Sequence, residues 1–390
     1  MRFVSLVSDD ERSETALAQI VEQARQATAG KIDVVFAFLT AQHREYADSI
    51  VEKLWLELDP QALIGCTAEG VIGGTREIEG TSGLVVLAGD MPDVRLHPFH
   101  IAAEEWETLL ADPAALAERM GRGPQTRAVI ALGDPFTTPV VELMDQMDQQ
   151  MSGSPLIGGM ASAGRSPGSN ALLRNDQIFS DGMVGVSLSG NVAVQTVVSQ
   201  GCRPIGRTLV VTKARQDVIE QLGGKPAMTA LGEIVAELPE RDRRQIQAGG
   251  LLLGRAISEY RDQFGRGDFL IRGLAGADQR TGAIRVGDLV RVGQTVQFHV
   301  HDATAAHDDL QLMLDPARIG SPPPAALLFS CNGRGTRLFE QSGHDVGLAA
   351  AAMPRTAIAG FFAAGELGPV GGRNFIHGHT ASFALLRPGA

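Results

Sequence analysis

Short apolar runs of strand length alternate along the chain with stretches in which apolar side chains recur at helical spacing. Within residues 43–58, Ile50 and Leu54 are two of the apolar side chains that fall on one face of a helix. The same spacing predicts further helices over residues 13–29 and 104–120. The pattern therefore predicts strands covered by amphipathic helices, which is an α/β arrangement.

One order of these runs occurs three times. An apolar run is followed by a helical interval, by a second run that contains G-x-x-A, and by a third apolar run. The first runs are VVFAFL (34–39), AVIAL (128–132) and AALLFSC (325–331). The G-x-x-A pairs are Gly65 and Ala68, Gly158 and Ala161, and Gly360 and Ala363. About 30 residues separate the first two runs of each copy, which fits a strand, a crossover helix and a return strand. We interpret the chain as three copies of a βαββ-like unit.

Length and a change in composition predict two domains. The chain has 390 residues, more than a single hydrophobic core usually accommodates. Beyond residue 222, long polar intervals separate runs that are typical of an antiparallel meander, namely FLIRGL, DLVRVG and TVQFHVHD. A polyproline connector at residues 321–324 leads into the third copy. The predicted domains are residues 1–222 and 223–390, both built from mixed sheets covered by helices.

Charge and cysteine content narrow the classes of function. The net charge of −11 and the pI near 5.3 argue against a nucleic-acid partner, because binding to phosphates needs clustered Lys and Arg. The cysteines Cys66, Cys202 and Cys331 are odd in number and widely spaced, which predicts neither a disulfide framework nor a thiolate metal site. The acidic N-terminal segment and the absence of an apolar run of about 18 residues predict a soluble cytoplasmic protein with no membrane span.

The segment from residue 358 to 380 is the strongest candidate for a ligand-facing loop. It reads IAGFFAAGELGPVGGRNFIHGHT and joins glycine-rich turns to Glu366, Arg373, His377 and His379. Glycine permits sharp turns and close approach of the backbone to another group. In this segment Glu366 is a candidate to bind an ammonium group, with an exposed loop acid as the alternative.

A second candidate lies just before it, at the end of an apolar run. Cys331 precedes Asn332-Gly333-Arg334-Gly335, and a helix is expected from about Thr336. A thiol at a helix N-terminus beside an arginine is a candidate nucleophile or redox sensor, although a buried cysteine is also a common core residue. The same turn, with Arg334 and Arg337, is a candidate anion cradle or simply a tight structural turn.

Metal and nucleotide sites are not expected. His377 and His379 would share one face of a strand and, together with His344 and Asp345, would supply metal ligands, but hydrogen-bonded loop histidines are the simpler interpretation. The Gly333 and Gly335 pair lacks the third glycine of a dinucleotide fingerprint, so no cofactor is predicted.

Several segments together resemble one known family. They include IGCTAEGVIGG, PLIGGMASAG, KPAMTAL, LLFSCNGRGTRLF and GFFAAGELGPVGGRNFIHGHTASFALL, and they cover the chain from about residue 28 onward. In this order they resemble the FIST (F-box and intracellular signal transduction) proteins, with a FIST N-terminal and a FIST C-terminal domain. The resemblance implies a sensory module that binds small ligands, with amino acids suggested, and no established enzyme activity. No output domain accompanies it here, so a separate signalling partner is implied.

These observations lead to three hypotheses. The first is a sensor that binds a small polar ligand between its repeated units, with the loops at residues 65–74, 158–164 and 360–372 around it. Its candidate ligand-binding residues are Gly65, Cys66, Cys331, Asn332, Arg334, Arg337, His344, Asp345, Glu366, Arg373, Asn374 and His377. The second is an enzyme in which Cys331 is the nucleophile and Glu366 or a histidine is the acid-base partner. The third is a scaffold whose glycine loops bind a protein.

Overall fold

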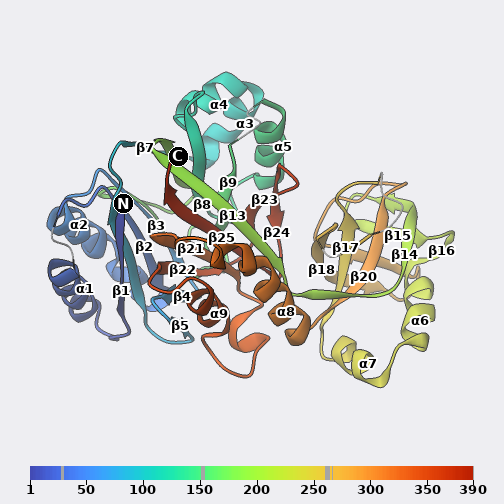
Figure 1. Ribbon diagram of the computed structural model, residues 1–390. Helices are drawn as coiled ribbons and strands as arrows, with labels where there is room; N and C mark the ends of the chain where they lie inside the picture. The colour runs from blue at the N-terminus through green and yellow to red at the C-terminus, as the bar shows by residue number, and fades with distance from the viewer. Residues whose placement is uncertain (28–29, 151–153, 260–263, 266, 390) are drawn as a thin grey trace. The chain divides into compact units, whose positions relative to one another are not determined.

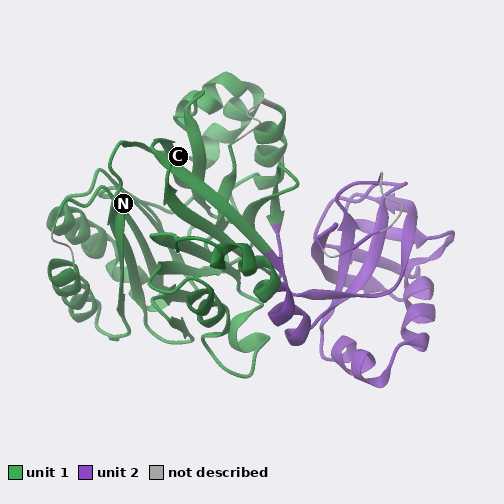
Figure 2. Cartoon of the chain, in the orientation of Figure 1, with its two compact units in different colours: residues 1–198, 310–376, 380–390 green, residues 199–309, 377–379 purple. Residues whose placement is uncertain are grey.

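The structure is a computed structural model that describes residues 1–27, 30–150, 154–259, 264–265 and 267–389. It divides into two compact units (Figure 2). Unit 1 comprises residues 1–198, 310–376 and 380–390, and unit 2 comprises residues 199–309 and 377–379. The chain is a mixed α/β protein, as the sequence predicts.

Unit 1 contains three repeats of one succession of elements (Figure 1). Repeat 1 consists of β1 (Arg2–Ser8), α1 (Ser13–Ala27), β2 (Val34–Thr40), η1 (Ala41–Tyr46), α2 (Ala47–Leu58), β3 (Ala62–Ala68), the hairpin of β4 (Gly70–Gly73) and β5 (Arg76–Glu79), and β6 (Leu84–Asp90).

Repeat 2 consists of β7 (Val94–Ile101), η2 (Ala103–Glu105), α3 (Trp106–Ala111), α4 (Pro113–Arg119), β8 (Thr126–Gly133), α5 (Val140–Gln150), β9 (Leu156–Met160), the hairpin of β10 (Leu172–Arg174) and β11 (Gln177–Phe179), and β12 (Met183–Gly190). The helix predicted over residues 104–120 is therefore two helices. Pro113 occupies the first turn of α4, and the Asp112 side chain accepts hydrogen bonds from the backbone N–H groups of Ala114 and Ala115.

Repeat 3 is interrupted by an insertion. It consists of β13 (Val192–Gln200), α8 (Ala303–Leu314), η3 (Asp315–Arg318), β21 (Ala325–Cys331), η4 (Gly335–Arg337), α9 (His344–Ala352), β22 (Ala357–Ala363), the hairpin of β23 (Glu366–Val370) and β24 (Arg373–His377), and β25 (Thr380–Pro388). Most of unit 2 is the chain between β13 and α8. The three βαββ-like copies seen in the sequence are thus the inner part of a larger repeat that starts one strand and one helical segment earlier.

The three repeats form three six-stranded sheets by one pairing rule. In each, a central strand pairs in parallel with the strand after its helix and antiparallel with the last strand of the repeat: β2 with β3 and β6, β8 with β9 and β12, β21 with β22 and β25. The hairpins are exchanged in a ring. That of repeat 1 joins the sheet of repeat 3, that of repeat 2 joins the sheet of repeat 1, and that of repeat 3 joins the sheet of repeat 2. Unit 1 therefore has approximate threefold symmetry.

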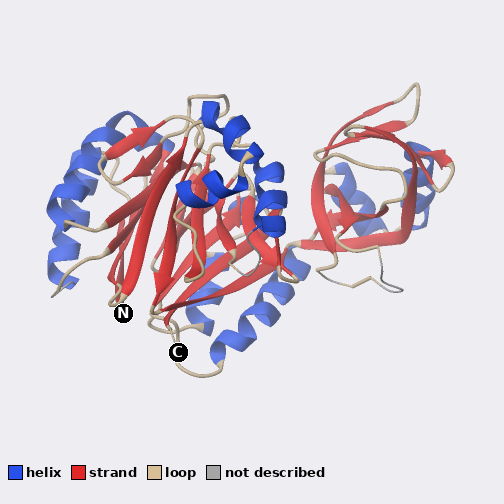
Figure 3. Ribbon diagram, turned by 90° about the horizontal axis from the view of Figure 1, so that it is seen from above, coloured by secondary structure: helices blue, strands red, loops and turns tan. Residues whose placement is uncertain are grey.

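Alternate side chains of the central strands serve two kinds of core. One set packs in a core shared by all three repeats. In it the Phe361 ring contacts that of Phe38 from repeat 1 and that of Phe329 from its own repeat, with ring centroids 5.1 and 5.6 Å apart. The other set packs in a separate core for each repeat, under its own helices. Burial on both faces explains why these strands are almost wholly apolar in sequence. Figure 3 shows the strands of unit 1 in its interior and the helices along its outside.

The repeated glycines are required by close contact between parallel strands. A Cβ atom at Gly65, Gly158 or Gly360 would lie 2.0, 1.8 or 1.7 Å from the backbone oxygen of the residue opposite, which is Ala37, Ala131 or Leu328. No side chain fits at these positions. The G-x-x-A sequences are therefore structural signatures of the repeat.

Unit 2 is a closed antiparallel barrel. Its strands are β14 (Cys202–Arg215), β15 (Val218–Leu222), β16 (Lys225–Pro226), β17 (Leu251–Ala256), β18 (Phe269–Asp278), β19 (Ala283–Val286) and β20 (Thr295–His301), and its helices are α6 (Ala227–Glu237) and α7 (Glu240–Gln247). Pairing of β14 with both β20 and β15 closes the sheet. Of the three predicted meander strands, DLVRVG at residues 288–293 is irregular instead.

Candidate functional site

The strongest candidate site is a cavity of about 620 Å³ in unit 1, where the carboxyl ends of the three parallel strand pairs meet. It is lined by Ala41, Gln42, Glu69, Gly80, Pro135, Phe136, Ser162, Ala163, Gly164, Arg165, Asn332, Arg337 and Ala364. These residues come from all three repeats. In open α/β sheets, ligands bind beyond the carboxyl ends of the strands, because loops there are free to vary while the strands hold them in place.

The lining follows the threefold pattern of the fold. Glu69, Ser162 and Ala364 each stand four positions after the close-contact glycine of their repeat. Ala41, Pro135 and Asn332 each stand four positions after the residue opposite that glycine. Equivalent positions thus carry different side chains, so the three repeats contribute one asymmetric polar lining.

Ser162 links the strand ends of the three repeats by hydrogen bonds. Its hydroxyl group accepts a hydrogen bond from the Glu69 backbone N–H at 2.9 Å and donates one to the Phe362 carbonyl oxygen. The Ala364 N–H donates to the Met160 carbonyl oxygen at 2.9 Å. One side chain of repeat 2 therefore contacts the loops of repeats 1 and 3, and the mouth of the cavity is held by hydrogen bonds between repeats.

The charges at the cavity are Glu69, Arg337 and Arg165. The Arg337 guanidinium group forms a bidentate ion pair with Glu69, with one contact at 3.0 Å, and donates to the Asn332 carbonyl oxygen at 2.6 Å. The hydrogen bond with Glu69 raises the pKa of Arg337, although partial burial acts against it. Arg165 is exposed on the loop between β9 and β10. A smaller cavity of about 220 Å³ shares Glu69, Asn332 and Arg337 and adds Glu79 and Thr336. The site therefore offers both signs of charge.

Arg334 does not line this cavity. It is fully buried and forms a bidentate ion pair with Asp345, with both contacts at 2.7 Å. Ser330 and His344 also hydrogen-bond to the Asp345 carboxylate, at 2.8 and 2.9 Å. Burial alone would raise the pKa of Asp345, but the charge and hydrogen bonds of Arg334 outweigh it and hold that pKa well below the usual range. Arg334, His344 and Asp345 thus form an internal network that supports the loop.

The helix expected from Thr336 is a single 3-10 turn, and the α-helix of this repeat begins at His344. The hairpin of repeat 1 supplies the groups that satisfy these backbone amides. Glu79 accepts hydrogen bonds from the Thr336 N–H and hydroxyl groups, and Glu77 accepts them from the Gly343 and Val346 N–H groups at 3.0 Å. Burial, together with the charge of Asp345, raises the pKa of Glu77 to about 7. The thiol of Cys331 is therefore not at an α-helix N-terminus.

Cys331 and Glu366 form a buried pair at the ends of adjacent strands of unit 1. Cys331 is 7% exposed and Glu366 is fully buried. One carboxylate oxygen of Glu366, Oε2, accepts hydrogen bonds from the Thr380 N–H and hydroxyl groups at 3.1 and 2.8 Å. Burial raises the pKa of Glu366 to about 8, against the hydrogen bonds of Thr380 and Cys331 and the charge of Arg334, which lower it. The acid and the thiol proposed from the sequence therefore do lie together.

The remaining predicted residues lie elsewhere. Gly65 and Cys66 are buried within β3, and burial raises the pKa of the Cys66 thiol. Arg373 and Asn374 contact Asp148, which accepts a hydrogen bond from the Arg373 side chain at 3.2 Å and one from the Asn374 N–H at 2.9 Å. His377 belongs to unit 2. Across the described ranges, no group of three or more His, Cys, Asp and Glu side chains is placed to hold a metal ion.

The sequence indicated Asn332 and Arg337 as site residues, and it placed Glu69 and Ser162 within the loops expected around the ligand without naming them. It missed Arg165, Gln42 and Phe136. The repeat itself carried a usable signal, because Glu69, Ser162 and Ala364 directly follow the G-x-x-A sequences. The sequence predicted that the three glycine loops surround one ligand, but it did not indicate the exchange of hairpins between repeats.

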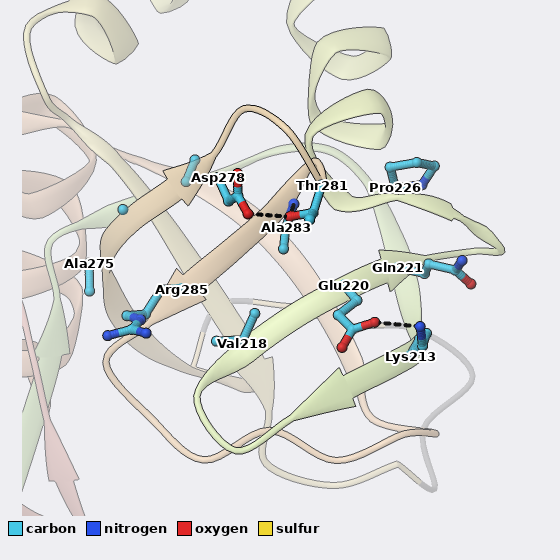
Figure 4. Close-up of a pocket in the computed structure, with 12 residues that line it drawn as sticks. Lys213, Val218, Glu220, Gln221, Pro226, Ala275, Asp278, Thr281, Ala283 and Arg285 are labelled. Carbon is cyan, nitrogen blue, oxygen red and sulfur yellow. Dashed lines mark hydrogen bonds and ion pairs between the residues drawn. The ribbon is translucent and has the colours of Figure 1, made fainter.

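Unit 2 has a cavity of its own, of about 760 Å³, on its barrel (Figure 4). Four of its polar side chains pair with one another, Lys213 with Glu220 at 2.6 Å and Thr281 with Asp278 at 2.8 Å. The small residues from Ala275 to Ala277 form part of its wall. It offers fewer convergent polar groups from distant parts of the chain than the cavity of unit 1 does.

Comparison with known proteins agrees with this architecture. Residues 33–225 match the FIST N domain and residues 227–369 match the FIST C domain. An uncharacterized protein of Mycobacterium tuberculosis is 38% identical over 374 residues, which cover 95% of this chain and 96% of that protein. An uncharacterized protein of Mycobacterium bovis is 38% identical over 377 residues, which cover 95% of each chain.

The fold and the two matching domains define a two-domain α/β protein of a class associated with signal transduction and small-ligand sensing. The chain belongs to the FIST family. The FIST C domain covers most of the barrel and much of repeat 3, so the family's domains and the compact units divide the chain differently. None of the helices in the described part of the chain combines the length and the apolar character needed to cross a bilayer.

Proposed function

We propose that this chain is a sensory protein that binds a small polar ligand, an amino acid or a related metabolite, in the cavity of unit 1. One observation carries the proposal: residues as far apart in sequence as Gln42, Ser162 and Arg337 line a single hollow at the carboxyl ends of parallel strands. Its volume of about 620 Å³ lies within the range of small-molecule sites.

The charges suit a zwitterion. Arg337 and Arg165 would hold a carboxylate, for which a guanidinium group provides two parallel donors. Glu69 would accept an ammonium group, and Gln42, Ser162 and Asn332 offer further polar contacts. Arg334 and Glu366, which the sequence suggested for these roles, lie behind the lining and would support it instead. A ligand carboxylate would compete with Glu69 for Arg337, which gives the bound and free states different hydrogen bonds for a signalling partner to recognise.

A thermal-shift screen with the twenty amino acids and common small metabolites tests the proposal. A ligand present at 100 times its Kd should stabilise the fold by about 2.7 kcal/mol and raise the melting temperature by a few degrees. The Arg337→Ala and Glu69→Gln variants should lose this shift.

Arg25→Ala is the matched control, because Arg25 forms a comparable exposed ion pair with Glu57 at 2.7 Å and is absent from the cavity lining. It should keep the full shift. Equal loss of the shift in Arg25→Ala, or no stabilising compound across the whole panel, would contradict the proposal.

A further inference from the structure

Cys331 and Glu366 lie at the ends of the adjacent strands β21 and β22–β23, directly behind two cavity-lining residues, Asn332 and Ala364. Carboxylates are rarely buried without a charged or hydrogen-bonding partner on each oxygen. Here the buried Oε1 atom of Glu366 receives no hydrogen bond from any nitrogen or oxygen donor in the described part of the chain. The thiol of Cys331 is its neighbour.

A backbone donor and positive charge lie near the sulfur. The Gly333 N–H donates to Sγ at 3.5 Å, and the positive charge of Arg337 acts on Cys331 from the cavity side. Arg334, also close enough to act on Glu366, adds a second positive charge. Burial raises the pKa of Glu366 to about 8, so its carboxyl group carries a proton near neutral pH and can act as a general acid beside the thiol.

We infer that Cys331 is a nucleophile that captures a small 2-oxo acid or aldehyde acid in this cavity as a reversible thiohemiacetal, with Glu366 as the group that moves the proton. Arg337 binds the carboxylate of the ligand, and the adjacent carbonyl carbon then faces the thiol. The inference rests on the proposed ligand site, because it uses the same cavity, and it names the chemical class of the ligand.

The step balances without any oxidant or reductant. Glu366 donates its proton to the carbonyl oxygen as sulfur attacks the carbonyl carbon. The S–C bond forms, and the π bond of the carbonyl group breaks with its electron pair on the oxygen that takes up this proton. The thiol proton then passes to the Glu366 carboxylate, which ends protonated, as it began. The product is a neutral thiohemiacetal, and reversal of the same steps releases the ligand.

Asn332 controls access to the sulfur. Its side-chain oxygen lies 3.9 Å from Sγ, and Asn332 itself lines the cavity while Cys331 is only 7% exposed. In this proposal the Asn332 side chain rotates to let the ligand reach the thiol. Asn332 is accordingly a positioning residue, and its replacement should change the rate of thiol modification without changing the chemistry.

The first test is the rate of alkylation of the native full-length protein by iodoacetamide, followed by peptide mass spectrometry. Cys66 and Cys202 are buried internal controls. Cys331 should react at least tenfold faster than either, faster still in Asn332→Ala, and several-fold more slowly in Glu366→Gln with a changed pH profile. Glu366→Asp should restore part of the rate. Equal, slow labelling of the three cysteines, or an unchanged pH profile in Glu366→Gln, would overturn the inference.

The second test observes the adduct with pyruvate labelled with carbon-13 at its carbonyl carbon. Bound pyruvate should show a resonance of a tetrahedral carbon that is absent in Cys331→Ser. Acetate, which has the carboxylate but no electrophilic carbon, separates the two proposals. If pyruvate protects Cys331 from alkylation no better than acetate and no tetrahedral resonance forms, covalent capture is wrong while the ligand site stands. If neither compound protects Cys331, this ligand class is wrong.

Discussion

At the scale of single residues, the third repeat places three buried ionisable side chains close to the cavity, Arg334, Asp345 and Glu366. Arg334 and Asp345 neutralise each other, whereas Glu366 is buried beside a thiol and the hydroxyl group of Thr380. Removing ions from water is costly unless partners replace the lost hydration. Glu366 meets this cost by remaining protonated near neutral pH, and this has a consequence for stability.

The stability of unit 1 should fall as the pH rises, because of Glu366. The pKa of Glu366 is about 8 in the folded protein against an ordinary 4.5, so the folded state binds this proton more tightly than the unfolded chain does. The resulting stabilisation of the folded state is complete only at a pH below the pKa of Glu366 in the unfolded chain. It is lost between about pH 4.5 and 8, up to a limit of about 5 kcal/mol at roughly 1.4 kcal/mol per pKa unit. Urea titrations at pH 5 and 8.5 measure this loss.

Glu366→Gln is the control, because the amide keeps the shape and cannot ionise. Glu77, with a pKa raised to about 7, contributes in the same direction in both proteins and cancels in the difference. The wild type should lose more stability than the variant between the two pH values. Parallel pH profiles for the two proteins would show that Glu366 is ionised in the folded state.

At the scale of elements, the position of each central strand pair depends on one glycine. We expect Gly360→Ala to destabilise the protein by at least about 3 kcal/mol, since its Cβ would lie 1.7 Å from the Leu328 oxygen and the two strands would have to separate. Gly347→Ala is the matched control, because Gly347 lies within α9 with no atom near its Cβ position. This substitution should raise the free energy of unfolding by about 0.5–1 kcal/mol. Urea unfolding measures the free energy of unfolding of both variants. If Gly360→Ala leaves it unchanged, the close-contact explanation is wrong.

The helices and strands also show which parts of the fold could be predicted from the sequence. Periodicity located the repeated strands and α2, because these depend on local patterns of apolar residues. It did not give the break before Pro113 or the 3-10 turn at Gly335–Arg337, where individual side chains such as Asp112 and Glu79 decide the ends. Residue chemistry paired Cys331 with Glu366 and selected Arg337 as a ligand-binding residue. The sequence did not indicate the ion pair between Arg337 and Glu69, because it depends on contact between residues 268 positions apart.

At the scale of the whole molecule, the two units should differ in their ability to fold alone. The barrel closes on itself and has its own apolar core around Leu253, Phe298 and Val300. A sheet without open edges needs no external partner strand. We therefore expect a fragment of residues 199–309 to give a cooperative thermal transition by circular dichroism.

A fragment of residues 1–90 should not do so. It contains all of repeat 1, but its β3 edge would lack the hairpin of repeat 2, its own hairpin would lack β22, and Phe36 and Phe38 would face water. Cooperative unfolding of this fragment as a monomer would show that the exchanged hairpins are not required. The two fragments are controls for each other, because both are taken from the same chain and measured in the same way.

The exchange of hairpins also delays one strand pairing during biosynthesis. Val71 in the first hairpin pairs with Phe361, about 290 residues later. At a translation rate of roughly 5–20 residues per second, this hairpin waits about 15–60 s on the ribosome before its partner strand exists. During that interval the nascent chain presents an unsatisfied strand edge to solvent, so holding chaperones are expected to be needed more for this protein than for a chain of equal length with consecutive domains.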